Sequence, residues 1–148
     1  MPSLSIHKVT VMRITYQNLT AEGLRGETLA HYLVDIEADF RLLDGQRVVY
    51  GEPCFPVIEL ARALHTWAES QRVADFVFDS MSFEEPGAVV IVRSAAGWVF
   101  GSRLTPEVTS DTVSWQEVQE GVNEFVASVR SDLMGLGIDP AQIFPDRK

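Results

Sequence analysis

The chain has one cysteine, Cys54, and this scarcity excludes two kinds of site. A single cysteine cannot close an intrachain disulfide, and it cannot supply the several thiolates of a structural zinc centre. Cys54 lies between Pro53 and Pro56, with no basic neighbour in sequence that would activate it as a nucleophile. We therefore expect it to be a small buried side chain.

Long apolar runs are also missing. No stretch approaches the ~20 residues that a helix needs to cross a bilayer, and residues 1–8 lack the basic segment and apolar block of a secretory signal. Because 46% of the 148 residues are hydrophobic, the chain can still bury a substantial core. We expect one soluble, cytoplasmic domain spanning residues 1–148, with no membrane partner.

Basic residues are scarce, with 12 lysines and arginines against 21 acidic residues, for a formal net charge of −9. Affinity for nucleic acid depends largely on Lys and Arg displacing counterions, so a nucleic acid partner is not expected. The excess is uneven: residues 1–74 carry 9 acidic and 7 basic side chains, and residues 75–148 carry 12 and 5. This asymmetry either attracts a basic partner protein or only keeps the chain soluble.

Catalytic and metal-binding motifs are absent as well. The sequence contains no HExxH pair, no Gly-x-Ser-x-Gly elbow and no glycine-rich phosphate loop. His7, His31 and His65 have no spacing that suggests a shared metal. We therefore predict no catalytic residue, no metal site and no cofactor.

The residues that are present form clear periodic segments. Residues 30–42 alternate between apolar and polar side chains and predict one long strand, preceded by a first strand over residues 9–16. Asp44-Gly45 predicts a hairpin turn, for which we prefer a three-residue loop with Gly45 left-handed and Phe40 opposite Val48.

Helical spacing begins after the hairpin. An apolar stripe predicts a helix from Pro56 to about Ser70, and a β-meander follows over residues 75–79, 88–93 and 98–104. Ser114 and Glu117 form a capping box, which predicts the start of a second long helix. The order β-β-β-α-β-β-β-α predicts an α+β domain, with a mostly antiparallel sheet of about six strands and two main helices packed on one face.

Two groups of residues are candidates for binding a partner. If the apolar side of residues 30–42 faces the helices, then Asp35, Glu37 and Asp39 form an acidic row on the opposite, wet face. This row is either a solvated surface or a docking face for a basic protein. A divalent metal fits less well, because one straight strand does not converge its carboxylates on a single ion.

The second group lies in the predicted loop of residues 79–87, where no core periodicity accounts for the side chains. Its candidate residues are acidic or apolar: Asp79, Met81, Phe83, Glu84 and Glu85. Loops of this composition make good docking surfaces. The alternative is an ordinary hairpin loop whose aromatic ring packs inward.

Residues 52–61 (EPCFPVIELA) and 76–85 (FVFDSMSFEE) resemble an uncharacterised family of small bacterial proteins. In size, acidity and α+β layout the chain also resembles the immunity proteins that neutralise bacterial toxins. These resemblances imply no catalytic residue. They are compatible with a non-enzymatic protein-binding module, for example an immunity-type inhibitor, in which the acidic face and loop cover a basic partner.

Two other functions are consistent with the sequence. One is a small enzyme or ligand-binding domain with a pocket between sheet and helices, near Trp67 and Tyr32. The other is an assembly subunit that pairs through an exposed strand edge. The sequence does not fix the oligomeric state.

Overall fold

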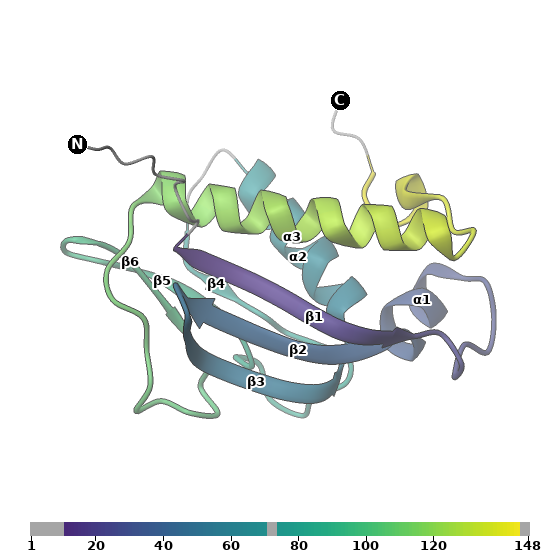
Figure 1. Cartoon of the computed structure of the whole chain (residues 1–148), viewed down its shortest axis with the longest axis horizontal. Coiled ribbons are helices and arrows are strands. Elements are labelled where there is room, and N and C mark those ends of the chain that lie inside the picture. The colour runs from purple at the N-terminus through teal and green to yellow at the C-terminus, as the bar shows by residue number, and fades with distance from the viewer. Residues whose placement is uncertain (1–10, 71–73, 146–148) are drawn as a thin grey trace, which may run out of the picture.

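The computed structural model describes residues 11–70 and 74–145 of the chain. Figure 1 shows its elements, with the long helix α3 lying along three strands. In chain order the elements are β1 (Met12–Thr20), α1 (Leu29–Asp35), β2 (Glu37–Asp44), β3 (Arg47–Phe55), α2 (Val57–Glu69), β4 (Phe76–Val77), β5 (Val90–Ser94), β6 (Gly97–Gly101), α3 (Trp115–Gly135) and the 3₁₀ turn η1 (Pro140–Gln142).

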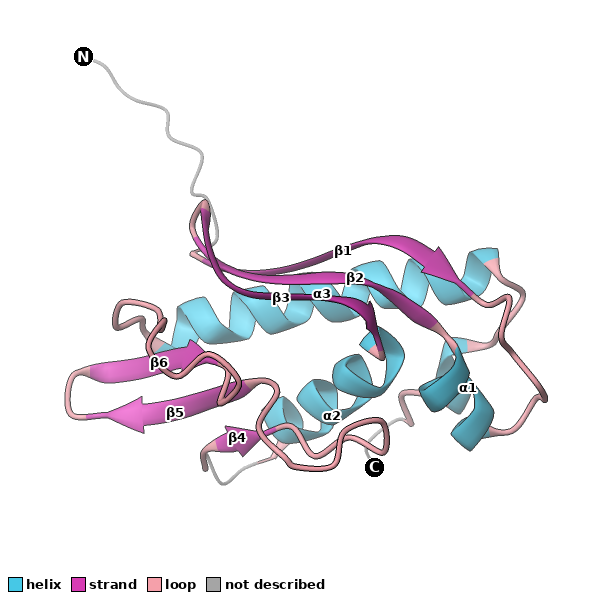
Figure 2. Ribbon diagram, turned by 90° about the horizontal axis from the view of Figure 1, so that it is seen from below, coloured by secondary structure: helices cyan, strands magenta, loops and turns pink. Residues whose placement is uncertain are grey.

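The strands form two antiparallel sheets of three, ordered β1-β2-β3 and β4-β5-β6, in an α+β fold. The prediction of about six strands in one sheet is therefore wrong, although the β4-β5-β6 meander is confirmed. The two sheets are separated along the chain by α2, which leads away from β3. Figure 2 shows α3 running along the β1-β2-β3 sheet, with the smaller sheet near the N-terminal end of that helix.

The prediction of one strand over residues 30–42 is also wrong, because Leu29–Asp35 forms helix α1 and the strand starts at Glu37. The helix begins at Thr28, whose hydroxyl accepts a hydrogen bond from the backbone N–H of His31. The buried side chains Tyr32, Leu33 and Ile36, with the partly buried Leu29, also fit a helical stripe. The sequence of this segment therefore fits both the two-residue period of a strand and the 3.6-residue period of a helix. The N-terminal cap at Thr28 favours the helix.

The β2-β3 hairpin turns where expected but with a different register. Its loop has two residues, because Asp44 pairs with Arg47, and Gly45 is left-handed as predicted, with φ of 63°. A register shift between Leu42 and Leu43 places Leu42 opposite Tyr50 and Leu43 opposite Val48. Phe40, Leu42 and Tyr50 are thus still buried together, whereas Val48 is exposed.

The two long helices match the sequence prediction closely. Helix α3 begins at the predicted capping box: the Ser114 hydroxyl accepts from the backbone N–H of Glu117, and the Glu117 carboxylate accepts from that of Ser114. The helix ends at Gly135, and beyond it Gly137 is left-handed, with φ of 80°, and the Ile138 N–H donates to the Leu133 carbonyl. These bonds satisfy backbone groups that a helix leaves unpaired at its ends.

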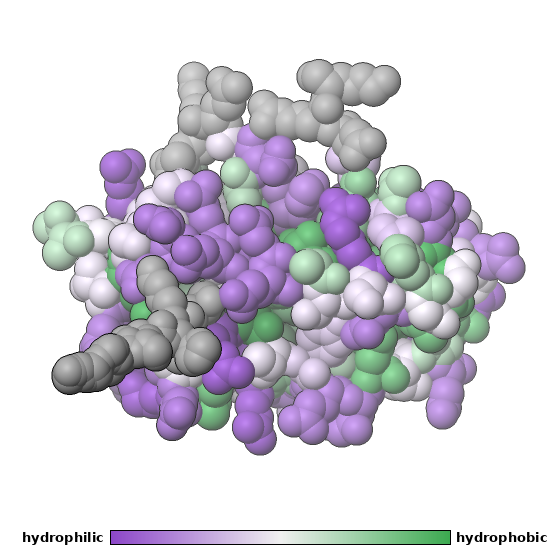
Figure 3. Space-filling view, turned by 45° about the horizontal axis from the view of Figure 1, so that its top comes forward, coloured by the Kyte–Doolittle hydropathy of each residue, from purple (hydrophilic) through white to green (hydrophobic). Residues whose placement is uncertain are grey.

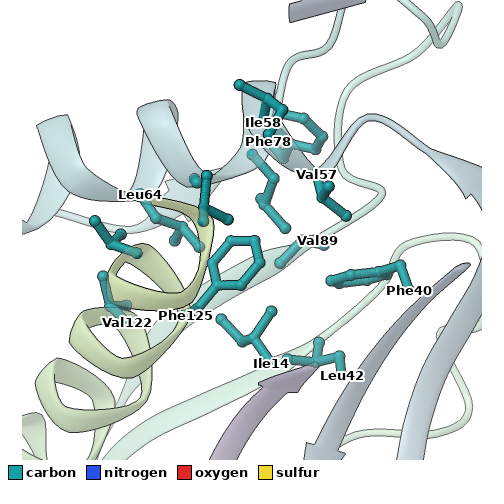
Figure 4. Close-up of a cluster of buried hydrophobic side chains, with 14 of the residues drawn as sticks. Ile14, Phe40, Leu42, Val57, Ile58, Leu64, Phe78, Val89, Val122 and Phe125 are labelled. Atoms are coloured by element: carbon teal, nitrogen blue, oxygen red, sulfur yellow. The ribbon is translucent and has the colours of Figure 1, made fainter. Parts of the chain in front are cut away.

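The core lies between the β1-β2-β3 sheet and the helices. Figure 4 shows Phe125 of α3 and Leu64 of α2 directed toward Ile14 and Leu42 of the sheet. The three tryptophans form a second aromatic cluster, in which Trp67, Trp98 and Trp115 have ring centroids 5.2–5.9 Å apart. The cluster joins α2, β6 and α3, so it connects the smaller sheet to the main core.

Cys54 differs from the expectation of a buried side chain, because it is exposed in β3 and has a positive φ of 53°. It follows Pro53, which is exposed too. The strand therefore turns irregular at this point, before Phe55 returns to the core with no exposed surface.

Candidate functional site

A surface hollow with a volume of about 500 Å³ lies where α1, the start of β2 and the 79–87 loop meet. It brings together three of the predicted partner-binding residues, Asp35, Glu37 and Met81, although they come from a helix, a strand and a loop. The other lining residues are Thr20, Glu22, Gly23, Arg25, Val34 and Ser82. We call this hollow, with all nine residues, the acidic hollow.

The charges of the acidic hollow are unbalanced. Glu22, Asp35 and Glu37 contribute three carboxylates, and Arg25 contributes the one guanidinium among the lining residues. The Asp35 carboxylate accepts a hydrogen bond of 3.1 Å from the backbone N–H of Arg25, so it also holds the connection between β1 and α1. The lining has a net charge of −2 and is open to water, which suits the binding of a cationic side chain.

Met81 adds an apolar group at the rim of the acidic hollow. Its side chain is 60% exposed, one of the most exposed large hydrophobic side chains that the structure describes. Exposed methionine is flexible and polarizable, and it is common on surfaces that bind other proteins. A partner segment that brings a lysine or arginine into the hollow would thus find an apolar contact beside it.

The remaining predicted residues lie elsewhere. Asp39 lies on the outer face of the β1-β2-β3 sheet, where its carboxylate accepts from the Asn18 side chain at 2.8 Å. Asp79, Glu84 and Glu85 are exposed in the loop but do not line the hollow. Phe83 packs its ring 5.6 Å from that of Phe55, as the ordinary-loop alternative expects. The predicted row of three acids on one strand is therefore wrong, because Asp35 belongs to α1 and only Glu37 and Asp39 share a face of β2.

Two other depressions lie on or beside the β1-β2-β3 sheet. One, of about 300 Å³, lies on the outer sheet face and includes Asp39 and Arg41, so its charges are mixed. The other, of about 370 Å³, lies between β1 and α3, where the Tyr16 hydroxyl donates to the Asp132 carboxylate at 2.5 Å. Burial, and then this hydrogen bond and the Asp132 charge, raise the pKa of Tyr16 above its ordinary value.

Trp67 and Tyr32 do not lie in the surroundings expected for a shared ligand pocket. The Trp67 ring is packed against Phe76, Trp98 and Trp115, and its indole N–H donates to the carbonyl of Ala74. Tyr32 instead borders a hollow of about 260 Å³ at the C-terminal end of α3. Figure 3 shows that the face carrying α3 mixes hydrophilic and hydrophobic side chains without one large apolar patch.

Within residues 11–70 and 74–145, no three histidine, cysteine or acidic side chains are grouped as a metal ion would require. His7, one of the three histidines, lies outside the described residues. No helix of the described chain combines the length and apolar character needed to cross a membrane.

Sequence reasoning missed Glu22, Arg25 and the buried carboxylate of Glu59. Glu59 is 8% exposed and receives hydrogen bonds from the 79–87 loop. A signal for it exists: Val57, Ile58, Leu60 and Ala61 surround it in sequence, and a helix turn that is apolar on all sides must bury its one acid. Glu22 and Arg25 lie in an irregular connection, which carries no periodic signal.

Comparison with known proteins gives one match. Residues 12–135 match the model of a family described as a domain of unknown function (DUF7878). No curated protein and no solved structure matches the chain.

Proposed function

The chain belongs to the family described as a domain of unknown function (DUF7878), and from its surface geometry we propose that it is a non-enzymatic module that binds a basic partner protein. The partner contributes a segment with a lysine or arginine side chain, which enters the acidic hollow, and an apolar side chain, which contacts Met81. The net charge of −9 attracts a positively charged partner over a distance, so the two proteins associate fast at low salt.

The observation that carries this proposal is the convergence of Glu22, Asp35 and Glu37 on one concave surface beside exposed Met81. These residues belong to the β1–α1 connection, the end of α1, the start of β2 and the 79–87 loop, which packing and hydrogen bonds hold together, so the surface exists before a partner arrives. A preformed surface loses less conformational entropy on binding.

An immunity-type inhibitor is one form that such a module takes, because an acidic protein can neutralise a basic toxin by covering it. This finer role is supported by the size and acidity of the chain, which such inhibitors share. It predicts that the natural partner is itself toxic and loses its activity in the complex.

The proposed site is tested by titrating the isotope-labelled protein with hexalysine and following backbone amide shifts by NMR. We expect the largest shifts at Glu22, Glu37 and Met81, and no comparable shifts with hexaglutamate. Shifts of equal size at Glu107 and Asp111, which are exposed acids outside the acidic hollow, would show that the peptide binds negative charge in general. That result, or no shift at all, contradicts the proposal.

A further inference from the structure

Glu59, in the first turn of α2, is a buried carboxylate whose hydrogen-bond donors both come from one surface loop. Its Oε1 accepts from the Ser80 hydroxyl at 2.6 Å, and its Oε2 accepts from the backbone N–H of Met81 at 3.0 Å. Glu59 is 8% exposed and Ser80 is 4% exposed, so water competes little for these bonds. A buried carboxylate is strongly unfavourable unless donors satisfy it, so the helix and the loop depend on each other.

Further contacts hold the rest of the 79–87 loop. The Ser80 hydroxyl, which donates to Glu59, accepts from the backbone N–H of Ser82 at 2.9 Å. At the end of the loop, Gly87 N–H donates to the Phe78 carbonyl at 2.8 Å. The Glu59 bonds thus fix the part of the loop that carries Met81 and Ser82, the two loop residues that line the acidic hollow.

We propose that Glu59 is a positioning residue that holds Met81 and Ser82 at the rim of the acidic hollow. Its carboxylate does not line the hollow, so it acts through the loop and not by touching the partner. The consequence for binding rests on the proposed function, whereas the hold on the loop can be measured without any partner.

The effect of Glu59 on the loop is measured by the hydrogen-exchange rates of the Met81 and Ser82 amides in the variants Glu59→Ala and Ser80→Ala. A hydrogen bond to a charged acceptor is strong enough that we expect the Met81 amide to exchange about tenfold faster, or more, in Glu59→Ala. In Ser80→Ala the Ser82 amide loses its acceptor and exchanges faster while the buried charge is kept. If Glu59→Ala does not fold, the Met81 amide of Ser80→Ala supplies the comparison, because this variant removes one of the two Glu59 bonds but leaves the acceptor of the Met81 N–H in place. Faster exchange at Met81 is then the expected result.

Glu117→Ala is the matched control, because Glu117 also accepts a backbone N–H, that of Ser114 at the start of α3. We expect it to speed exchange at Ser114 and to leave Met81 and Ser82 unchanged. Exchange at Met81 and Ser82 that is the same in wild type, Glu59→Ala and Ser80→Ala overturns the proposal.

Hexalysine binding then separates this inference from the proposed function. We expect Ser80→Ala, which leaves every charge in place, to weaken hexalysine binding several-fold, and Glu117→Ala to leave it unchanged. Faster loop exchange together with unchanged hexalysine affinity in Ser80→Ala overturns the role of the loop position in binding. Faster loop exchange with no hexalysine binding by the wild type supports the hold by Glu59 and rejects the proposed function instead.

Discussion

Tyr16 and Tyr50 each donate a hydrogen bond of 2.5 Å to a carboxylate, that of Asp132 and that of Glu52 respectively. For both side chains, burial is the largest cause of a raised pKa, followed by the hydrogen bond and the charge of the acid. The Tyr16–Asp132 pair joins β1 to α3, whereas Tyr50 and Glu52 both lie on β3. These pairs therefore stabilise the fold only while the hydroxyls keep their protons.

The raised pKa values predict how stability changes in alkaline solution. In the unfolded chain a tyrosine ionises near pH 10, whereas in the folded protein both hydroxyls stay protonated at that pH. The folded state then binds more protons than the unfolded state, so the free energy of unfolding falls as pH rises above about 10. Urea unfolding of the wild type and of the Tyr16→Phe/Tyr50→Phe variant at several alkaline pH values measures this. The free energy of unfolding of the variant is expected to fall less steeply with pH than that of the wild type. An equal dependence on pH in both proteins would contradict the raised pKa values of the two tyrosines.

For individual residues, the sequence identifies charged side chains but not the groups that contact them. Asp35, Glu37 and Met81 were predicted to bind a partner, and the structure places all three around one hollow. Their grouping depends on α1 and on the loop held by Glu59, which are tertiary features. Cys54 shows the same limit, since its exposure follows from an irregular strand end that no periodic pattern marks.

Among the elements, helix α3 packs closely on β1 at Gly121. This glycine is buried, and a Cβ atom built on it would lie too near the Met12 carbonyl oxygen for normal van der Waals contact. The neighbouring atom is backbone, which cannot move aside as a flexible side chain would. A glycine in the middle of a helix is thus retained for packing, despite its poor helix propensity.

Gly121→Ala is therefore expected to destabilise the fold by up to about 2 kcal/mol, because overpacking costs about 1–3 kcal/mol and the gain in helix propensity offsets about 1 kcal/mol of this. The free energy of unfolding from urea denaturation measures the change. Gly135→Ala is the control on the same helix, since nothing lies within 4 Å of its Cβ position. It should be neutral or stabilising by up to about 1 kcal/mol. Equal effects of the two substitutions would rule out the packing explanation.

The elements that the sequence predicts best are those with signals at their ends as well as along their length. Helix α3 has both a capping box and a glycine stop, and its predicted start is confirmed. In residues 30–42 the alternation of apolar and polar side chains predicts a strand, but it does not take account of the helix cap at Thr28. The hairpin was placed correctly but its register was not, since a bulge and a longer loop satisfy the same apolar pattern.

For the whole molecule, the fold class is evident from the sequence but the division into two sheets is not. Strand order depends on which edges pair, and neither periodicity nor composition reports that. The acidic hollow is not evident from the sequence either, because it is built from residues near positions 22, 35 and 81, which only the fold brings together. The charge bias was visible in the sequence, whereas its concentration on a concave surface required the fold.

The proposed function requires that basic segments bind at the acidic hollow and not at negative charge in general. It is tested most directly by neutralising two carboxylates in the hollow, Glu22→Gln/Glu37→Gln, and two exposed ones outside it, Glu107→Gln/Asp111→Asn. Asp35 is left in place because it holds the Arg25 backbone. The two variants carry the same net charge, so long-range attraction is matched.

The decisive measurement is calorimetric titration of both double variants and the wild type with hexalysine at about 20 mM and about 150 mM salt. Exposed charges contribute about 0.2–1 kcal/mol each, so we expect Glu22→Gln/Glu37→Gln to weaken binding about 2- to 30-fold at the lower salt. Glu107→Gln/Asp111→Asn should bind like the wild type, and higher salt should reduce the difference between the variants. Equal loss of affinity in the two double variants would contradict the account.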